Sequence, residues 1–329
     1  MSQNSLPLVT VIIPVYNGTN YLREAIDCVL SQTYANYELI VVDDGSSDQT
    51  WAIIESFGSK LRGIHKENGG VASALNCGIR HARGAYIAWL SHDDLFLPEK
   101  LEHQINFLTK FNQYRACYTD YYIMDTKGNP LREVETPWYP REKAIRNLFG
   151  NMYINGSTML IERTCIDQVG FFSEELKYTQ DAEMWLRLIR QYDVGRLPEK
   201  LVKQRTHPGQ GSVSLRTAQR EETKNLFEKI FREWGSALIF PEFSNSLDDL
   251  RLVARGHTWF GDTMAFHRGF YDLADKHYLE SRNVWPSWRN PARWKLFFGS
   301  RIVFSPKRLY YHFARRIFKS KFPLIKFKA

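Results

Sequence analysis

The chain has 329 residues, enough for one large domain or two smaller ones with a substantial hydrophobic core. The first eight residues lack the apolar stretch of a signal peptide, and no run approaches the roughly 18 apolar residues of a membrane span. Four scattered cysteines without zinc-site spacing lie in apolar or helical patterns: Cys28, Cys77, Cys117 and Cys165. We therefore expect reduced core thiols and a cytoplasmic protein.

The net charge of +8 is concentrated at the C-terminal end. Residues 282–329 contain 13 of the 44 lysines and arginines and no acidic residue, whereas the rest of the chain has 31 basic and 36 acidic residues. Basic and aromatic residues alternate over 285–329, which is typical of an interfacial helix pair on an anionic membrane. A basic helical cap or an oligomer contact would have the same composition. No nucleic-acid-binding module is recognisable, so we expect no nucleic-acid partner.

Four short apolar segments at the start of the chain have the character of buried strands: 8–13, 37–42, 61–65 and 85–90. Between them lie segments of helical periodicity, the first of which is expected to be capped by Thr19 or Asn20. This alternation with short loops predicts an α/β fold, a doubly wound and mostly parallel sheet flanked by helices. Right-handed crossovers bring the carboxyl ends of the strands to one edge, where ligands bind in such folds.

The pattern changes after a helix that Pro98 opens. Strand-like segments at 116–124, 157–161 and 195–204 alternate with a short helix at 142–149 and an amphipathic helix at 179–190. From Leu215 onward the pattern is mostly helical. We therefore predict a first domain over 1–213 with two parts, 1–112 and 113–213, then a helical extension over 214–284 and the basic aromatic tail over 285–329.

Candidate ligand-binding residues follow the first two predicted strands: Pro14, Tyr16 and Asn17 after the first, Asp43 and Asp44 after the second. An aromatic ring can stack on a base, and a carboxylate can accept a hydrogen bond from a base N–H or a ribose hydroxyl. Turn and capping chemistry is the alternative, because Asp-Gly-Ser performs it routinely. The chain has no G-x-G-x-x-G after the first strand and no P-loop motif, which disfavours a dinucleotide dehydrogenase and a P-loop enzyme.

Two adjacent carboxylates, Asp93 and Asp94, follow the strand at 85–90. Carboxylates at a strand end repel each other and lose solvation, and a divalent metal that carries phosphates would offset both effects. The alternative is a turn, or the cap of the helix that Pro98 opens. These two residues alone do not decide between a metal site and a helix cap.

Two further residues are candidates for chemistry. Asp181 lies near the start of the amphipathic helix, where the helix dipole favours an acidic residue for structural reasons alone. Its functional interpretation is a general base that removes a proton from a sugar hydroxyl. His207 lies in a glycine-rich loop after the last predicted strand, where it is either solvated or a ligand to a metal or phosphate.

The order and spacing of these motifs resemble glycosyltransferase family 2, the inverting enzymes with the GT-A fold. The resemblance covers roughly residues 8–210. The motifs are Val11-Ile-Ile-Pro-Val-Tyr-Asn17, Leu30-Ser-Gln-Thr-Tyr34, Glu38-Leu-Ile-Val-Val-Asp-Asp-Gly-Ser-Ser-Asp48, Asn68-Gly-Gly70, Trp89-Leu-Ser-His-Asp-Asp94 and Gln180-Asp181. No single motif is specific, but the set in this order is.

The resemblance implies a role for each candidate residue. It assigns nucleotide binding to Pro14, Tyr16, Asn17, Asp43, Asp44 and Ser91; a Mn²⁺ or Mg²⁺ ion to Asp93, Asp94 and His207; the acceptor side to Asn155, Gly156 and Ser157; and the general base to Asp181. Residues 1–112 would then bind the nucleotide-sugar, and 113–213 the acceptor. Ser91 departs from the family, because many members have aspartate as the first residue of this D-x-D region. Ser91 can hydrogen-bond ribose but brings no charge to a metal.

The resemblance further implies a single displacement with inversion, in which a nucleotide-diphospho-sugar, UDP-linked by family habit, donates its sugar to a hydroxyl. If the tail binds membrane, the acceptor is a saccharide linked to a polyprenyl diphosphate at the cytoplasmic face of the inner membrane, in bacterial surface polysaccharide synthesis. Two alternatives remain at this stage: a sugar nucleotidyltransferase, and a membrane-associated scaffold that lost activity through Ser91. The sugar, the acceptor and the oligomeric state are not predicted.

Overall fold

The computed structural model describes residues 6–210, 216–239, 249–287 and 289–298. The chain forms two compact units, residues 1–234 and 235–329. The division falls within helix α9 (Arg216–Ile239), where Gly235 has a φ of 69° that interrupts the helical conformation. The sequence pattern puts the change of architecture near 213, and in the structure the first turns of α9 belong to the N-terminal unit.

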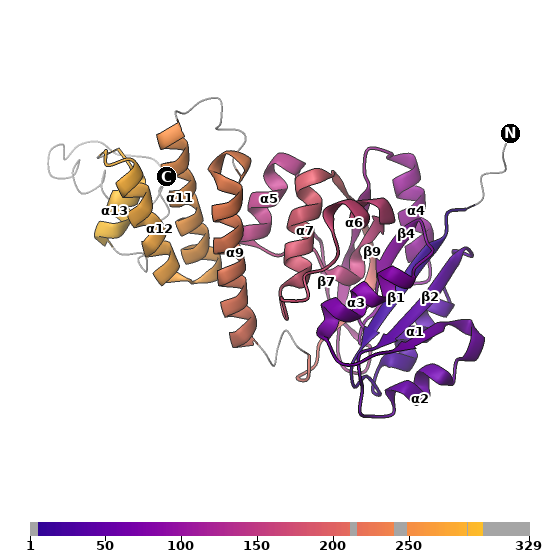
Figure 1. Ribbon diagram of the computed structural model, residues 1–329. Helices are drawn as coiled ribbons and strands as arrows, with labels where there is room; N and C mark the ends of the chain where they lie inside the picture. The colour runs from indigo at the N-terminus through magenta and orange to yellow at the C-terminus, as the bar shows by residue number, and fades with distance from the viewer. Residues whose placement is uncertain (1–5, 211–215, 240–248, 288, 299–329) are drawn as a thin grey trace, which may run out of the picture. The chain divides into compact units, whose positions relative to one another are not determined.

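The described part of the N-terminal unit is built on one sheet (Figure 1), which has nine strands. Eight of them run in the order β3-β2-β1-β4-β8-β6-β9-β5, and β7 pairs with β6. Their bounds are β1 Val9–Val15, β2 Tyr37–Asp43, β3 Arg62–His65, β4 Tyr86–Trp89, β5 Leu95–Phe96, β6 Ala116–Met124, β7 Pro130–Val134, β8 Leu160–Glu162 and β9 Val194–Arg205. The predicted α/β fold is confirmed, with β3, β2, β1 and β4 parallel, and β8, β5 and β7 each paired antiparallel.

Strand β1 is the centre of the hydrophobic core. All seven of its residues are buried, as expected for a continuous apolar run with strands on both sides. Helix α3 (Gly70–His81) packs closely on this strand, because a Cβ added at Gly78 would lie 2.5 Å from the side chain of Ile12. The first turn of α3 lies at the carboxyl edge of the sheet, because the amides of Gly69 and Gly70 donate to Asp44, which follows β2.

The remaining helices of this unit are α1 Leu22–Leu30, α2 Thr50–Glu55, α4 Lys100–Lys110, α5 Arg141–Gly150, α6 Arg163–Val169 and α7 Gln180–Gln191, with a short 3-10 helix at Gly58–Lys60. The predicted cap of α1 is wrong. The helix begins after Tyr21, which makes no side-chain capping bond, and the Thr19 hydroxyl donates instead to Asp48 in the next loop. A tertiary contact therefore replaces the local cap.

The strand predicted at 157–161 is partly wrong. Residues Gly156–Thr158 form a 3-10 helix, and strand β8 occupies only Leu160–Glu162. Asn155 causes the difference, because its Oδ1 accepts a hydrogen bond from the Ser157 amide at 2.9 Å. The Asn155 carbonyl also accepts from the Thr158 hydroxyl and so closes the turn.

The four cysteines are free thiols, as predicted. Cys117 and Cys165 are buried, and burial raises the pKa of Cys117 to about 12. A buried thiol with a raised pKa is unreactive, so a structural role follows for Cys117. Within the described ranges, every helix is too short or too polar to cross a bilayer.

One lysine is buried in the core under the sheet edge. Lys100 is fully buried, its Nζ donates to Gln104 Oε1 at 2.7 Å, and it lies 4.0 Å from the centre of the Phe96 ring. Burial lowers the pKa of Lys100 to about 7. Gln104 in turn donates to the Thr158 carbonyl (2.9 Å), so Lys100 and Gln104 together support the 3-10 turn at Gly156–Thr158.

The C-terminal unit is helical where it is described. Its helices are α11 Asp249–Thr263, α12 Tyr271–Val284 and α13 Pro291–Phe298. A π-helical turn at Met264–Arg268 joins the first two and ends at Gly269, which has a φ of 66°. The predicted helical extension is thus described in part, whereas residues 299–329 of the predicted tail lie outside the described residues.

Candidate active site

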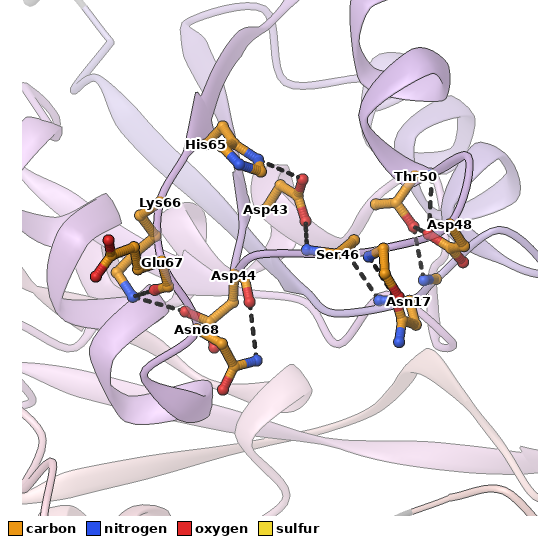
Figure 2. Close-up of polar contacts among 12 residues, drawn as sticks. Asn17, Asp43, Asp44, Ser46, Asp48, Thr50, His65, Lys66, Glu67 and Asn68 are labelled. Atoms are coloured by element: carbon orange, nitrogen blue, oxygen red, sulfur yellow. Dashed lines mark hydrogen bonds and ion pairs between the residues drawn. The ribbon is translucent and has the colours of Figure 1, made fainter.

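The loops that follow β1 and β2 are tied together by side-chain hydrogen bonds (Figure 2). Asn17 has a left-handed φ of 50°, its Oδ1 accepts from the Ser47 amide (2.9 Å), and its own amide donates to Ser46 Oγ (2.8 Å). Asparagine tolerates this backbone conformation better than most residues. Asn17 therefore fixes the geometry between the two strand ends, while the Tyr16 side chain beside it is half exposed.

Asp43 holds the end of β2 against the end of β3. It is fully buried, and it accepts a hydrogen bond from the Ser46 amide at 3.1 Å. Its other carboxylate oxygen lies 2.8 Å from Nδ1 of His65 (Figure 2). In this structure the carboxylate therefore organises the loop through the protein's own donors.

Asp44 organises the loop that leads into α3. Its carboxylate accepts hydrogen bonds from Lys66 Nζ at 2.7 Å and from the amides of Gly69 and Gly70 at 3.0 and 2.7 Å. Asn68 donates to the Asp44 carbonyl (Figure 2). Sequence reasoning identified the Asn-Gly-Gly motif but not its partner, because a lysine in a loop carries no signal of an ion pair 22 residues away.

The end of β4 carries the two carboxylates of the D-x-D region. Both oxygens of Asp94 are bound: Oδ2 accepts from Ser157 Oγ (2.8 Å) and Oδ1 accepts from the Arg205 amide (3.0 Å). Burial and the charge of Asp93 raise the pKa of Asp94 to about 8. Ser157 Oγ also lies 3.2 Å from the Ser91 amide, from which it accepts a hydrogen bond. The 3-10 turn and the D-x-D region thus form one connected structure.

Arg205 is the residue that sequence reasoning missed. Its side chain is 1% exposed, and its Nε donates to the Asp93 carbonyl at 2.9 Å. The same guanidinium donates to the Thr126 carbonyl (3.0 Å) and to Glu24 (2.7 Å), and it lies 4.4 Å from the centre of the Tyr21 ring. Arg205 thereby holds the backbone of the D-x-D region in place through the Asp93 carbonyl. Arg205 and Glu24 are 181 residues apart in the sequence.

His207 and Asp93 face each other at this edge. His207 Nε2 lies 3.1 Å from Asp93 Oδ2, and both side chains are largely buried. A carboxylate oxygen and an imidazole nitrogen at this separation fit a divalent ion such as Mn²⁺, which accepts both donor types. The side chain of Asp94, in contrast, is already bound by protein donors through both oxygens.

A cavity of about 420 Å³ opens at the carboxyl end of β4. It is lined by Pro14, Val71, Trp89, Ser91, His92, Asp93, Asp94, Tyr121, Met152, Tyr153, Ile154, Asn155, Gly156, Lys177, Tyr178, Gln180, Asp181, Gln204, Gln210 and Gln219. Its volume is that of a small-molecule site. Three aspartates and one lysine line it, so carboxyl groups outnumber cationic side chains, and the cavity suits a ligand that arrives with a cation.

Seven of the predicted site residues share this cavity: Pro14, Ser91, Asp93, Asp94, Asn155, Gly156 and Asp181. The other six lie outside its lining: Tyr16, Asn17, Asp43, Asp44, Ser157 and His207. Of these six, Ser157 and His207 contact Asp94 and Asp93 directly. Asp43 is the last residue of β2, and Tyr16, Asn17 and Asp44 lie in the loops after β1 and β2. The structure therefore gathers the predicted metal, acceptor and base residues at one sheet edge.

Asp181 is the second residue of helix α7 and lines the cavity. Its Oδ1 accepts a hydrogen bond from the Ala182 amide at 2.7 Å. Burial raises the pKa of Asp181 from its ordinary value of 3.8 to about 6. Such a carboxylate is ionised at neutral pH yet basic enough to accept a proton.

A single carboxylate holds the segment that precedes Asp181. Glu222 of α9 accepts hydrogen bonds from the amides of Lys177 (3.0 Å), Tyr178 (2.8 Å) and Thr179 (2.8 Å), and from the Thr179 hydroxyl (2.7 Å). These donors are the main-chain groups that lead into α7. Glu222 thereby sets the position of the helix N-terminus on which Asp181 is carried.

Two glycines are required by aromatic neighbours in the site. A Cβ at Gly18 would lie 2.3 Å from Val15 and 2.9 Å from the His92 ring, and one at Gly156 would lie 2.5 Å from the Trp89 ring. Burial lowers the pKa of His92. His92 of the D-x-D region thus lies against the loop after β1, and it forms part of the cavity wall.

Comparison with known proteins is consistent across sequence and structure. The family model for "Glycosyl transferase family 2" matches residues 10–170. An uncharacterised glycosyltransferase of Rickettsia prowazekii is 44% identical over 238 residues, 71% of this chain and 74% of the relative. The Escherichia coli protein WfgD, named UDP-Glc:alpha-D-GlcNAc-diphosphoundecaprenol beta-1,3-glucosyltransferase, is 29% identical over 71% of this chain and 87% of its own length.

A solved structure extends the likeness to the fold. The mannosyltransferase PcManGT from Pyrobaculum calidifontis, solved with GDP-Man and Mn²⁺, superposes with a TM-score of 0.56 at 18% identity. The match covers 98% of this chain and 89% of that protein. At 18% identity the likeness shows a shared fold alone. Membership of the family is shown by the relatives that are similar in sequence. The chain belongs to glycosyltransferase family 2, and it is a glycosyltransferase with the GT-A fold.

Proposed function

We propose that the protein transfers a sugar from a UDP-linked donor to a hydroxyl of a saccharide carried on a polyprenyl diphosphate, with inversion at the anomeric carbon. The observation that carries the proposal is the shared acidic cavity of Asp93, Asp94 and Asp181 at the carboxyl end of β4. The name of WfgD supports the donor and acceptor classes, because it specifies UDP-glucose and a diphosphoundecaprenol-linked sugar. The reaction belongs to surface polysaccharide synthesis.

Asp93 and His207 would hold the divalent ion, with Asp94 as a buried support that keeps the loop in place. When bound, Mn²⁺ or Mg²⁺ supplies positive charge beside the diphosphate of the donor. The 3.1 Å separation of Asp93 Oδ2 and His207 Nε2 supports this division of roles, as does the full use of the Asp94 oxygens by Ser157 and Arg205. Ser91 then contributes a hydroxyl to the donor rather than a metal ligand.

Asp181 would remove the proton from the acceptor hydroxyl as that oxygen attacks the anomeric carbon. The bond to the leaving diphosphate breaks on the opposite face, and this single displacement inverts the configuration. The raised pKa of Asp181 supports this role. The acceptor would approach along Asn155 and Gly156, which line the same cavity.

The proposal is tested with purified full-length protein, a panel of nucleotide-sugars and a synthetic polyprenyl-diphosphate saccharide. We expect Mn²⁺-dependent transfer from one UDP-sugar, and NMR of the product should give the inverted anomer. Asp181→Asn should retain donor binding by calorimetry and lose at least about 1,000-fold in kcat. A retained anomer would refute the single displacement. Metal-dependent binding of UDP without transfer to any acceptor would favour the scaffold alternative.

Localisation at the cytoplasmic face of the inner membrane is part of the same proposal. The basic, aromatic composition of residues 285–329 supports it. Truncation after residue 298 is preferable to truncation at 285, because Asn290 donates to the carbonyls of Ser281 and Trp285 within the C-terminal unit. Removal of residues 299–329 is expected to abolish sedimentation with anionic liposomes, and unchanged sedimentation would refute membrane binding by these residues.

A further inference from the structure

Two histidines and a glutamate converge between helices α11 and α12 of the C-terminal unit. The potential ligand atoms of His257, His277 and Glu280 all lie within 4.8 Å of one another. Nδ1 of His257 lies 2.8 Å from Nδ1 of His277 and 3.2 Å from Glu280 Oε2. The cluster belongs to a different unit of the chain from the candidate active site.

Helices α11 and α12 lie side by side (Figure 1), and hydrogen bonds hold them in register on both sides of this cluster. On one side Ser281 Oγ donates to the Ala254 carbonyl at 2.6 Å, and on the other the Tyr278 hydroxyl donates to Asp262 at 2.7 Å. The small residue Gly261 allows the Tyr278 ring to lie against α11, since a Cβ there would be 2.6 Å from the ring. The three side chains are therefore presented by a preorganised helix pair, which lowers the entropic cost of binding a ligand between them.

The arrangement suits a cation better than it suits hydrogen bonding alone. Nδ1 of His257 can carry only one hydrogen, yet it has both His277 Nδ1 and a carboxylate oxygen within hydrogen-bond distance. If His257 Nδ1 carries the hydrogen, two acceptors share it, and if His277 Nδ1 donates instead, the lone pair of His257 Nδ1 faces the carboxylate. A divalent ion accepts the lone pairs of both imidazoles and of the carboxylate at once.

We propose that His257, His277 and Glu280 bind one divalent transition-metal ion of the zinc class, with water in the fourth position. Imidazole nitrogens favour such ions over Mg²⁺ or Ca²⁺. Tetrahedral coordination with bonds of about 2.0 Å separates two nitrogen ligands by about 3.3 Å, so the 2.8 Å separation of the two Nδ1 atoms opens by a few tenths of an ångström. His277 is fully buried, whereas the side chains of His257 and Glu280 are 14% and 29% exposed and give the ion its route from solvent. The ion joins α11 to α12.

The experiment uses full-length protein with Asp93→Asn in every sample, so that the candidate active-site metal site is weakened throughout. After chelator treatment and dialysis, zinc binding is measured by calorimetry, and bound metal is counted by mass spectrometry. We expect one equivalent of zinc and a higher melting temperature with zinc. The partly exposed ligands are replaced singly, by His257→Gln and by Glu280→Gln, to avoid a cavity at the buried His277. Each replacement should weaken binding by about 100-fold or more and abolish the thermal shift.

The matched control is His267→Gln, because His267 is exposed in the same unit and lies outside the cluster. It should leave the stoichiometry and the affinity unchanged. Absence of zinc binding in the parent protein would overturn the proposal and leave a hydrogen-bonded histidine pair. Zinc affinity that is unchanged by both His257→Gln and Glu280→Gln would overturn it as well. Neither readout depends on transferase activity, so the proposal stands or fails independently of the proposed function.

Discussion

Replacement of Asp181 by asparagine should stabilise the protein while it abolishes activity. Burial raises the pKa of Asp181 from 3.8 to about 6, so the folded state holds a carboxylate less favourably than the unfolded chain does. Each pKa unit corresponds to 1.36 kcal/mol, and the full cost above pH 6 is therefore about 3 kcal/mol. Asparagine keeps an oxygen that can accept from the Ala182 amide but carries no charge.

The sign of the pH dependence follows from proton binding. Between about pH 4 and pH 6 the unfolded chain has released the Asp181 proton while the folded protein still holds it, so raising the pH destabilises the wild type relative to the variant. The gap in unfolding free energy should grow by about 1.5 kcal/mol from pH 5 to pH 8. Below pH 4 this contribution disappears because both states are protonated.

The assay is urea unfolding of wild type and Asp181→Asn at pH 5, 6, 7 and 8, followed by circular dichroism. Asp193→Asn is the control, because Asp193 is half exposed and pairs only loosely with Arg141 at 3.8 Å. Its effect should be below about 1 kcal/mol at every pH. A difference in unfolding free energy between wild type and Asp181→Asn that is the same at pH 5 and pH 8 would refute a raised pKa for Asp181. In the wild type, kcat/KM should rise with pH through about 6, since the base must lose its proton.

Three further variants test the supports of the site. Glu222→Gln places an N–H group against the Lys177 amide, so it should lower kcat about 10-fold with little change in the KM for the donor. The control Glu221→Gln, at an exposed neighbour, should change neither kcat nor KM. Equal effects of the two variants would refute a positioning role for Glu222. Gly18→Ala should lower the unfolding free energy by about 1–3 kcal/mol and weaken UDP binding, because the new Cβ would overlap Val15 and approach His92. An unchanged melting temperature would contradict this prediction. The unfolding free energy of the wild type should rise between pH 7 and pH 10, because the unfolded chain holds the Lys100 proton there and the folded core does not. Lys100→Met should remove this rise. Parallel pH profiles of the two proteins would show that Lys100 stays charged in the fold.

The sequence predicted the parts of the fold that depend on local patterns. The limits of β6 agree with the predicted 116–124, and those of β9 differ by one residue at each end from 195–204. Both segments are long, and β6 is also rich in aromatic and apolar residues, so their strand character is clear. The position of Asp93 and Asp94 at the carboxyl edge could also be inferred, because right-handed crossovers bring the ends of parallel strands to one edge. Asp181 does not follow a strand, so only the family resemblance pointed to it, and the structure places it in the same cavity.

The missed features depend on contacts between distant segments. Arg205 and Glu222 look like ordinary residues of a strand end and a helix surface, and only the folded chain brings them to Asp93 and Thr179. The sequence predicts a strand over 157–161, but a local side-chain bond from Asn155 makes its first residues a 3-10 turn. Single-residue signals of this kind have no periodicity from which they could be inferred.

The position of β9 within the sheet has a consequence for how the protein folds during synthesis. This strand lies between β6 and β5, and its last residue, Arg205, closes the D-x-D region against Glu24. A nascent chain that ends before residue 194 therefore has an unpaired edge on β6 and no support behind Asp93. Such an edge is prone to aggregation. Ribosome-bound chains should consequently acquire metal and nucleotide affinity in one late step, after β9 has left the exit tunnel, rather than gradually as the first four parallel strands form.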